Sequence, residues 1–303
     1  MSIIKVINIS KRFGEVQAVD NLSFEVRPGE IFGLLGPNGA GKTTSIRMIL
    51  DIFEPDSGEI SVLDGPMTEE KKNRIGYLPE ERGLYQDIPL ERCLTFLASL
   101  KGMEPNEIHT QMTDYLKRFE LYEYRNKKVK ELSKGMQQKA QLISTLIHDP
   151  EIVIIDEPFI SLDPVNTEMV KDILEMKRDE GKAIIMSTHQ MNQVEELCDR
   201  ILLIDHGKRV LYGTLGEIQN QFSSKDIMVT PLTELPGAID GVREIKKLNG
   251  RFRLVLAENA APNEILKSLI NRGVELLEFE IAVPPLNEIF IQVVQNKGGV
   301  DNV

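Results

Sequence analysis

Tryptophan is absent from this 303-residue sequence, and cysteine occurs only twice. No stretch approaches the ~18 apolar residues that a membrane-spanning helix needs, and the beginning lacks the apolar segment of a signal peptide. Cys93 and Cys198 both fall on apolar helical stripes, which predicts buried thiols and no disulfide. The sequence therefore predicts a cytoplasmic protein, for which any work at a membrane requires a membrane-embedded partner.

An excess of positive charge is also missing. The 36 basic residues are outnumbered by 47 acidic ones, which gives a formal net charge of −11. Such a chain repels nucleic-acid backbones, so no nucleic-acid partner is expected. The 41 % hydrophobic and 27 % charged residues are typical of a soluble globular protein, and the length predicts two domains.

Hydrophobic patterning divides the chain into distinct segments. Strand patterns alternate with turns before residue 87, helical periodicity follows, and continuous apolar runs return from 152, as in a parallel sheet covered on both faces. A polar stretch at 220–225 marks a boundary. The pattern predicts an α/β domain over 1–220 with a helical insertion at about 87–150, and a small α+β domain over 226–296, ferredoxin-like in pattern. The elements expected in the second domain are strand 226–230, a hairpin near 243–256 that turns at Asn249-Gly250, helix 262–272, strand 274–282 and helix 285–295.

A phosphate-binding loop is the clearest motif. Gly36-Pro37-Asn38-Gly39-Ala40-Gly41-Lys42-Thr43-Thr44 fits G-x-x-x-x-G-K-[ST]. It lies between an expected strand at 31–35 and an expected helix whose apolar face is formed by Ile46, Ile49, Leu50 and Phe53. That order directs backbone N–H groups and a helix N-terminus at one point, where a polyphosphate binds. Lys42 is expected to reach the β- and γ-phosphates and Thr43 to ligate Mg²⁺. The alternative is a glycine-rich turn that carries a lysine by chance.

A second motif places two carboxylates at the end of a buried strand. The run Ile152–Ile155 leads directly into Asp156-Glu157-Pro158. Asp156 suits a Mg²⁺ site, and Glu157 suits a general base that polarises the attacking water. The alternative is an acidic cap on the helix that follows.

The third motif carries a family resemblance. Ser133, in Leu132-Ser133-Lys134-Gly135-Met136-Gln137, lies 24 residues before Glu157 and is expected to cap a helix. Here the chain resembles the ATP-binding cassette (ABC) family, whose signature reads L-S-G-G-Q. The resemblance implies that Ser133 and Gly135 bind the γ-phosphate of an ATP held by another cassette. A plain capped helix is the alternative.

Other family elements follow in order over residues 3–220. The resemblance implies that Asp163 belongs to the D-loop, that His189 contacts the γ-phosphate and that Phe13 stacks on adenine. It implies a P-loop NTPase fold of the cassette type, with ATP and Mg²⁺ as cofactors.

Two motifs depart from the family pattern. Lys134 and Met136 replace the first glycine and the glutamine of the signature. Glu80 stands where the family has a glutamine that senses Mg²⁺ and the membrane subunit. A carboxylate there can still ligate Mg²⁺ but adds negative charge near the γ-phosphate, which predicts an altered metal dependence.

Leu78-Pro79-Glu80-Glu81-Arg82-Gly83-Leu84-Tyr85 and Pro284-Pro285-Leu286-Asn287-Glu288-Ile289-Phe290 resemble bacterial ABC-2-type exporters of the sodium-extrusion and drug-resistance group. The implied function is ATP hydrolysis on the inner face of the membrane, driving a separately encoded permease. A homodimer of cassettes is favoured, and a heterodimer is left open. The alternatives are a soluble ABC ATPase of translation, repair or iron–sulfur assembly, and a regulatory nucleotide-binding module without catalysis.

Overall fold

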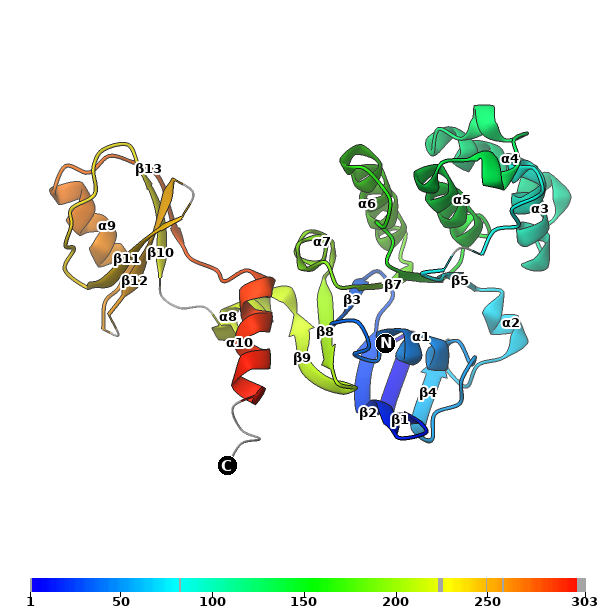
Figure 1. Cartoon of the computed structure of the whole chain (residues 1–303), viewed down its shortest axis with the longest axis horizontal. Coiled ribbons are helices and arrows are strands. Elements are labelled where there is room, and N and C mark those ends of the chain that lie inside the picture. The colour runs from blue at the N-terminus through cyan, green and yellow to red at the C-terminus, as the bar shows by residue number, and fades with distance from the viewer. Residues whose placement is uncertain (1, 82, 223–225, 249, 258, 299–303) are drawn as a thin grey trace. The chain divides into compact units, whose positions relative to one another are not determined.

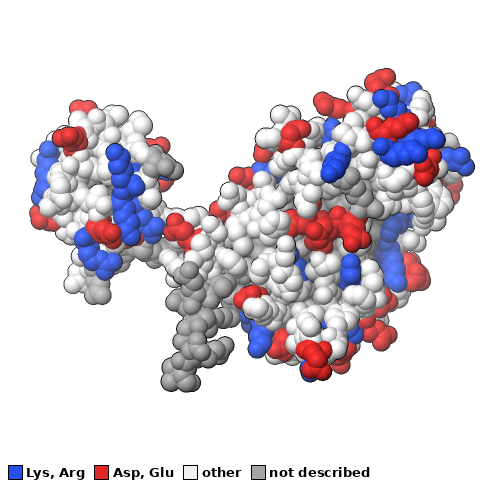
Figure 2. All heavy atoms as spheres, viewed as in Figure 1, with Lys and Arg blue, Asp and Glu red and all other residues white. Residues whose placement is uncertain are grey.

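The computed structural model describes residues 2–81, 83–222, 226–248, 250–257 and 259–298. The chain divides into two compact units, Met1–Leu215 and Gly216–Val303. Within the described residues, no helix combines the length and the apolar character needed to cross a bilayer. On the face in Figure 2, acidic and basic side chains are interspersed.

A six-stranded sheet forms the centre of the first unit (Figure 1). Five strands are parallel, and the last runs antiparallel to its neighbour. The inner strands carry continuous apolar runs and are buried, as expected for a sheet covered on both faces. In spatial order the strands are β5 (Ile75–Leu78), β6 (Ile152–Asp156), β7 (Ala183–Thr188), β3 (Ile31–Leu35), β8 (Arg200–Asp205) and β9 (Lys208–Thr214).

A smaller antiparallel sheet packs on the same core. Its strands are β2 (Val16–Val26), β1 (Ile4–Phe13) and β4 (Ser57–Val62), in spatial order. Between the two sheets, the rings of Phe24 and Phe32 stack with their centroids 5.5 Å apart. This packing fixes the position of β2 beside the loop that follows β3.

Helices cover the parallel sheet, and three of them form the insertion. The first helix ends earlier than its apolar spacing predicts: the pattern continues to Phe53, but Asp51 adopts a left-handed φ of 59°, which stops the helix. The helices are α1 (Lys42–Ile49), α2 (Glu69–Lys72), α3 (Leu90–Leu100), α4 (Pro105–Arg118), α5 (Lys134–Leu146), α6 (Pro164–Asp179) and α7 (Met191–Leu197), with 3₁₀ turns at Tyr122–Tyr124 and Val129–Glu131.

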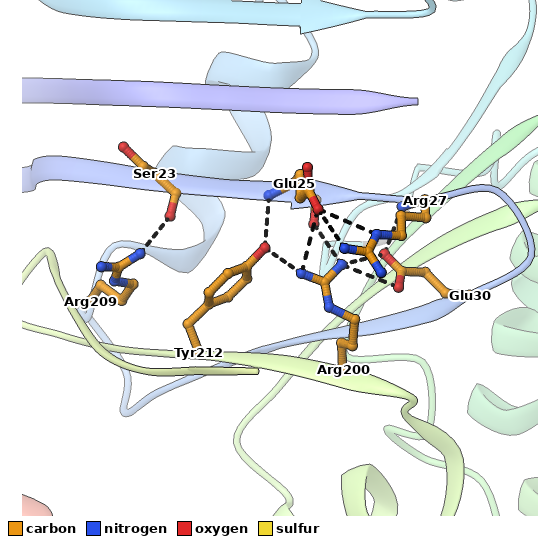
Figure 3. Close-up of polar contacts among 7 residues, drawn as sticks. All are labelled: Ser23, Glu25, Arg27, Glu30, Arg200, Arg209 and Tyr212. Carbon is orange, nitrogen blue, oxygen red and sulfur yellow. Dashed lines mark hydrogen bonds and ion pairs between the residues drawn. The ribbon is translucent and has the colours of Figure 1, made fainter. Parts of the chain in front are cut away.

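A buried arginine joins the two sheets of the first unit (Figure 3). The guanidinium of Arg200 on β8 lies 3.2 Å from the carboxylate of Glu30 and also hydrogen-bonds the Tyr212 hydroxyl of β9. It lies over the rings of Phe32 and Tyr212, at 5.9 and 5.1 Å from their centroids. A weaker contact reaches the backbone carbonyl of Glu25 on β2, at 3.5 Å. The arginine thereby ties β2 to the parallel sheet.

The second unit is an antiparallel sheet with a helix on its apolar face. Its order is β11-β12-β10-β13, and Ile227, Leu254 and Leu269 lie in its core. A ferredoxin-like pattern also requires a helix between β10 and β11, but residues 232–241 form none, because proline and glycine interrupt this segment. The elements are α8 (Leu215–Phe222), which spans the boundary between the units, β10 (Ile227–Pro231), β11 (Val242–Leu248), β12 (Arg251–Leu256), α9 (Pro262–Asn271), β13 (Leu276–Ile281) and α10 (Leu286–Gly298). Asn249, predicted in the hairpin turn, lies outside the described residues.

Candidate functional site

The loop from Gly36 to Gly41 connects β3 to α1 and can be built only with glycine at its two ends. A Cβ atom on Gly36 would lie 2.2 Å from the carbonyl oxygen of Ile204, and one on Gly41 would lie 2.4 Å from that of Ala18. Gly41 also has a left-handed φ of 109° and directly precedes the first residue of α1. The loop therefore holds the N-terminus of α1 open toward the cavity in front of it.

Lys42 is the first residue of α1, and its side chain reaches back to this loop. Its Nζ donates hydrogen bonds to the carbonyl oxygens of Gly36 at 2.8 Å and Pro37 at 3.2 Å. Burial lowers the pKa of Lys42 from its ordinary value, while the carboxylates of Glu157, Asp156 and Glu80 act in the opposite direction. A buried cation that only neutral oxygens bind directly is well prepared to accept an anion.

A cavity of about 320 Å³ lies beside the loop and brings most of the predicted site together. Thr43 donates from Oγ1 to Oδ2 of Asp156 at 3.0 Å across it. A second cavity of about 290 Å³ adjoins the first and shares Thr43, Glu80 and Asp156 with it. The first cavity is lined by Val16, Ala18, Asn38, Gly39, Ala40, Gly41, Lys42, Thr43, Thr44, Glu80, Asp156, Glu157 and His189.

The carboxylate of Glu157 is held by the end of the neighbouring strand β7. One oxygen accepts a hydrogen bond from Thr188 Oγ1 at 3.0 Å. The other accepts one from the His189 backbone N–H at 3.1 Å and lies 2.5 Å from His189 Nδ1. Glu157 is only 6 % exposed and has a left-handed φ of 54°, a conformation that costs a non-glycine residue free energy. The site thus fixes an acid and a histidine against each other beside the phosphate loop.

Several predicted residues lie outside the lining of this cavity. Ser133 caps α5, accepting from the Met136 N–H at 3.2 Å, and Asp163 caps α6, accepting from the Asn166 N–H at 2.9 Å. The ring of Phe13 packs edge-on against Phe53, with centroids 5.3 Å apart, and is 43 % exposed. Gly36, Pro37 and Gly135 complete this set. The roles predicted for them remain predictions.

Three residues at the site were not predicted from the sequence. Val16 and Ala18 on β2 form a wall of the cavity, although nothing in their type marks them. Thr188 holds Glu157, and only its position next to His189 could have drawn attention to it.

Comparison with protein families covers both units. Residues 19–160 match the family described as "ABC transporter", and residues 213–294 match "ATP-binding protein DrrA1-3-like, C-terminal domain". These matches confirm the prediction of an ABC cassette followed by a small α+β domain.

Individual relatives support the same assignment. The chain is 41 % identical to the uncharacterized ABC transporter ATP-binding protein YhaQ of Bacillus subtilis, over 95 % of this chain and 97 % of that one. It is 37 % identical to the ABC transporter ATP-binding protein NatA of Bacillus subtilis, over 74 % of this chain and 94 % of that one. A solved structure of the ATP-binding subunit of an ABC transporter aligns with a TM-score of 0.69 at 30 % identity, covering 73 % of this chain and 93 % of the other. The chain therefore belongs to the ATPase subunits of ABC transporters, in the group that carries a DrrA-like C-terminal domain.

Proposed function

We propose that this ATPase subunit, on the inner face of the membrane, drives an exporter permease encoded as a separate chain. The observation that carries the proposal is the single cavity joining the phosphate loop to Asp156, Glu157 and His189. Residues 1–220 act as the cassette, with the helical insertion at about 87–150, and residues 226–296 form the C-terminal domain. The family match disfavours a non-transport ATPase, because the C-terminal domain matches that of the DrrA-like proteins.

The residues around Thr43 fit a bound Mg²⁺. The Thr43 hydroxyl and the carboxylates of Asp156 and Glu80 are hard oxygen donors in adjoining cavities. Among the described residues, no group of three His, Cys, Asp or Glu side chains forms a protein-only metal site. This suits Mg²⁺, which binds through one or two carboxylates together with phosphate oxygens and water. When bound, the ion neutralises charge that develops on the transferred phosphoryl group.

Hydrolysis is assigned to Glu157 and His189. Lys42 and the loop N–H groups bind the β- and γ-phosphates, and Glu157 accepts the proton of the attacking water. His189 first holds the Glu157 carboxylate, and its half-exposed ring can then turn to the γ-phosphate. When ATP enters, His189 thereby leaves Glu157 for the γ-phosphate, and the Glu157 carboxylate is free to accept the proton of the attacking water.

The nucleotide is shared between two cassettes in this proposal. Ser133 and Gly135 lie outside the cavity that holds Lys42, so a second cassette supplies them to its partner's ATP. Two apolar side chains near residues of the proposed site are exposed: Val16, which lines the cavity, is 65 % exposed, and Val165, two positions after Asp163, is 77 % exposed. Apolar residues of this kind favour a buried interface. A homodimer satisfies both halves of the site with one sequence.

The permease is expected to dock beside Glu80. Tyr85 and Phe96 form an edge-to-face pair with centroids 5.6 Å apart, and they are 52 % and 44 % exposed. Leu100, one turn further along α3, is 61 % exposed. This patch follows the segment containing Glu80 in the chain. Docking of the permease there can therefore displace Glu80 at the metal site.

Recovery of partners from native membranes tests the transporter assignment. The Glu157→Gln variant, which is expected to remain bound to ATP, would be purified from detergent-solubilised membranes of its own host. We expect a polytopic membrane protein to be recovered in stoichiometric amount, and mass spectrometry would identify it. Recovery of only ribosomal, repair or cofactor-assembly proteins would overturn the proposal.

Substitution of Glu80 tests the metal assignment. We expect Glu80→Gln to shift the Mg²⁺ and Mn²⁺ concentrations needed for half-maximal ATPase by roughly tenfold, because the variant loses one charged ligand. Glu69→Gln makes the same change of charge on α2 and is the control, since Glu69 lines neither of the two cavities. Unchanged titrations of both ions in Glu80→Gln would remove this residue from the metal site.

A further inference from the structure

The N-terminal turns of α5 are fastened to the segment that follows Glu157. Gln138 donates from Nε2 to the carbonyl oxygen of Pro158 at 3.2 Å. A Cβ atom on Gly135 would lie only 3.1 Å from the carbonyl oxygen of Ser161, so the two backbones are in close contact. The helix that carries Ser133 thus rests on the segment between the proposed base and Asp163.

A third contact runs through a buried lysine that the proposed mechanism does not use. Lys139, on α5, is 6 % exposed and donates from Nζ to Oδ1 of Asn166 at 3.0 Å. Asn166 in turn donates from Nδ2 to Oδ2 of Asp163 at 2.6 Å and from its backbone N–H to Oδ1 at 2.9 Å. Three side chains from α5, α6 and the preceding loop therefore form one chain of hydrogen bonds.

Burial of the Lys139 ammonium group lowers the stability of the fold. Among the described residues its Nζ forms no ion pair, and burial lowers the pKa of Lys139 from its ordinary value, while the more distant carboxylates of Glu120 and Asp163 act in the opposite direction. A buried ammonium with one neutral partner destabilises the fold, and a leucine or methionine would fill this place at lower cost. Because Lys139 is present despite this loss of stability, we infer that it serves to orient its neighbours Asn166 and Asp163.

We propose that Lys139 is a positioning residue for hydrolysis: through Asn166 it fixes Asp163, and with it the segment that begins at Glu157. The inference rests on the proposed function, because it assigns Glu157 as the base. It goes further in making α5 and the segment from Glu157 to Asp163 one rigid body. A displacement of Ser133, where a second cassette's ATP binds, then also displaces Glu157.

Lys139→Met tests this role. We expect turnover at saturating ATP to fall about 10- to 100-fold, the loss typical of a displaced catalytic group, with the Kd for ATP unchanged within twofold. Lys139→Arg, which keeps a donor, should restore most of the turnover. Backbone amide exchange at Asn166 and Thr167 should accelerate in Lys139→Met, since their N–H groups bond to Asp163.

Lys101→Met is the matched control. Lys101 is also a lysine of the helical insertion whose Nζ bonds to neutral oxygens, the carbonyls of Lys72 at 2.7 Å and Ile75 at 2.9 Å. In the part of the chain that the structure describes, its Nζ forms no hydrogen bond with the segment after Glu157. Its variant should keep turnover within twofold of the parent. Equal losses in the two variants would reduce Lys139 to a structural role, and full turnover in Lys139→Met would overturn the proposal.

A second variant covers the case in which Lys139→Met does not fold. Asn166→Asp keeps an acceptor for Lys139 but removes the side-chain donor to Asp163 and puts a second carboxylate beside it. It should therefore lose turnover as Lys139→Met does, and unchanged turnover in it also overturns the inference. If the parent protein hydrolyses no ATP at all, the proposed function fails. The exchange rates at Asn166 and Thr167 then decide the inference alone.

Discussion

Replacement of Glu157 by glutamine is expected to slow ATP hydrolysis by about 10²- to 10⁴-fold, the usual contribution of a general base. The amide is nearly isosteric: its oxygen can still accept from the His189 N–H, and its NH2 group can donate to Thr188 Oγ1, so we expect the backbone at this strained residue to be kept. ATP binding should persist, because the phosphate loop is untouched. The variant should accumulate as an ATP-bound dimer, which size-exclusion chromatography with multi-angle light scattering would detect.

Glu69→Gln is the control for this experiment. Glu69 on α2 pairs only with the nearby Lys72 among the described residues and lies outside the cavity, so its loss changes the net charge alone. Its ATPase rate should equal that of the parent. Rapid turnover by Glu157→Gln would exclude Glu157 as the base. A monomer at saturating ATP would contradict the shared-nucleotide arrangement.

Lys42→Ala is expected to weaken ATP binding about 10- to 150-fold, the equivalent of one hydrogen bond to a charged group. The change removes the buried cation that faces the cavity and its hydrogen bonds to the carbonyls of Gly36 and Pro37, of which Pro37 still accepts from the Ala40 N–H. Isothermal titration with a slowly hydrolysed ATP analogue would measure the Kd directly.

Lys71→Ala provides the matched comparison. Lys71 also donates from Nζ to two backbone carbonyls, those of Val62 at 2.8 Å and Pro66 at 2.9 Å, but it lies outside the cavity. It should bind ATP as the parent does. Equal affinity of the parent and Lys42→Ala would exclude the assigned role of the phosphate loop.

The fold could be predicted where the determinants are local. The apolar runs at 152–155, 183–186 and 201–204 are strands, because a strand buried on both faces requires no other pattern. The early end of α1 could not be predicted, since it depends on a left-handed φ at Asp51 that many sequences avoid.

The residues of the site were also predictable only where the determinants are local. The phosphate loop is a contiguous motif, so its residues could be named from spacing alone. Contacts between residues far apart in the sequence could not be predicted from spacing. The hydroxyl of Thr188 bonds to Glu157, 31 positions away, and Lys139 bonds to Asn166, 27 positions away. Nothing in the residue types of Val16 and Ala18 indicates that they line a cavity, because their role depends on the packing of one sheet against another.

Arg200 has a consequence for how the nucleotide site can open. Its guanidinium joins β2, which carries Val16 and Ala18, to the strands beside the phosphate loop. The buried pair with Glu30 cannot separate cheaply, because either charge left alone would remain desolvated. We therefore expect the wall of the cavity and its floor to move together. We expect access for ATP and release of ADP to depend on movement of the helical insertion, or of the second cassette proposed above, against this fixed half of the site.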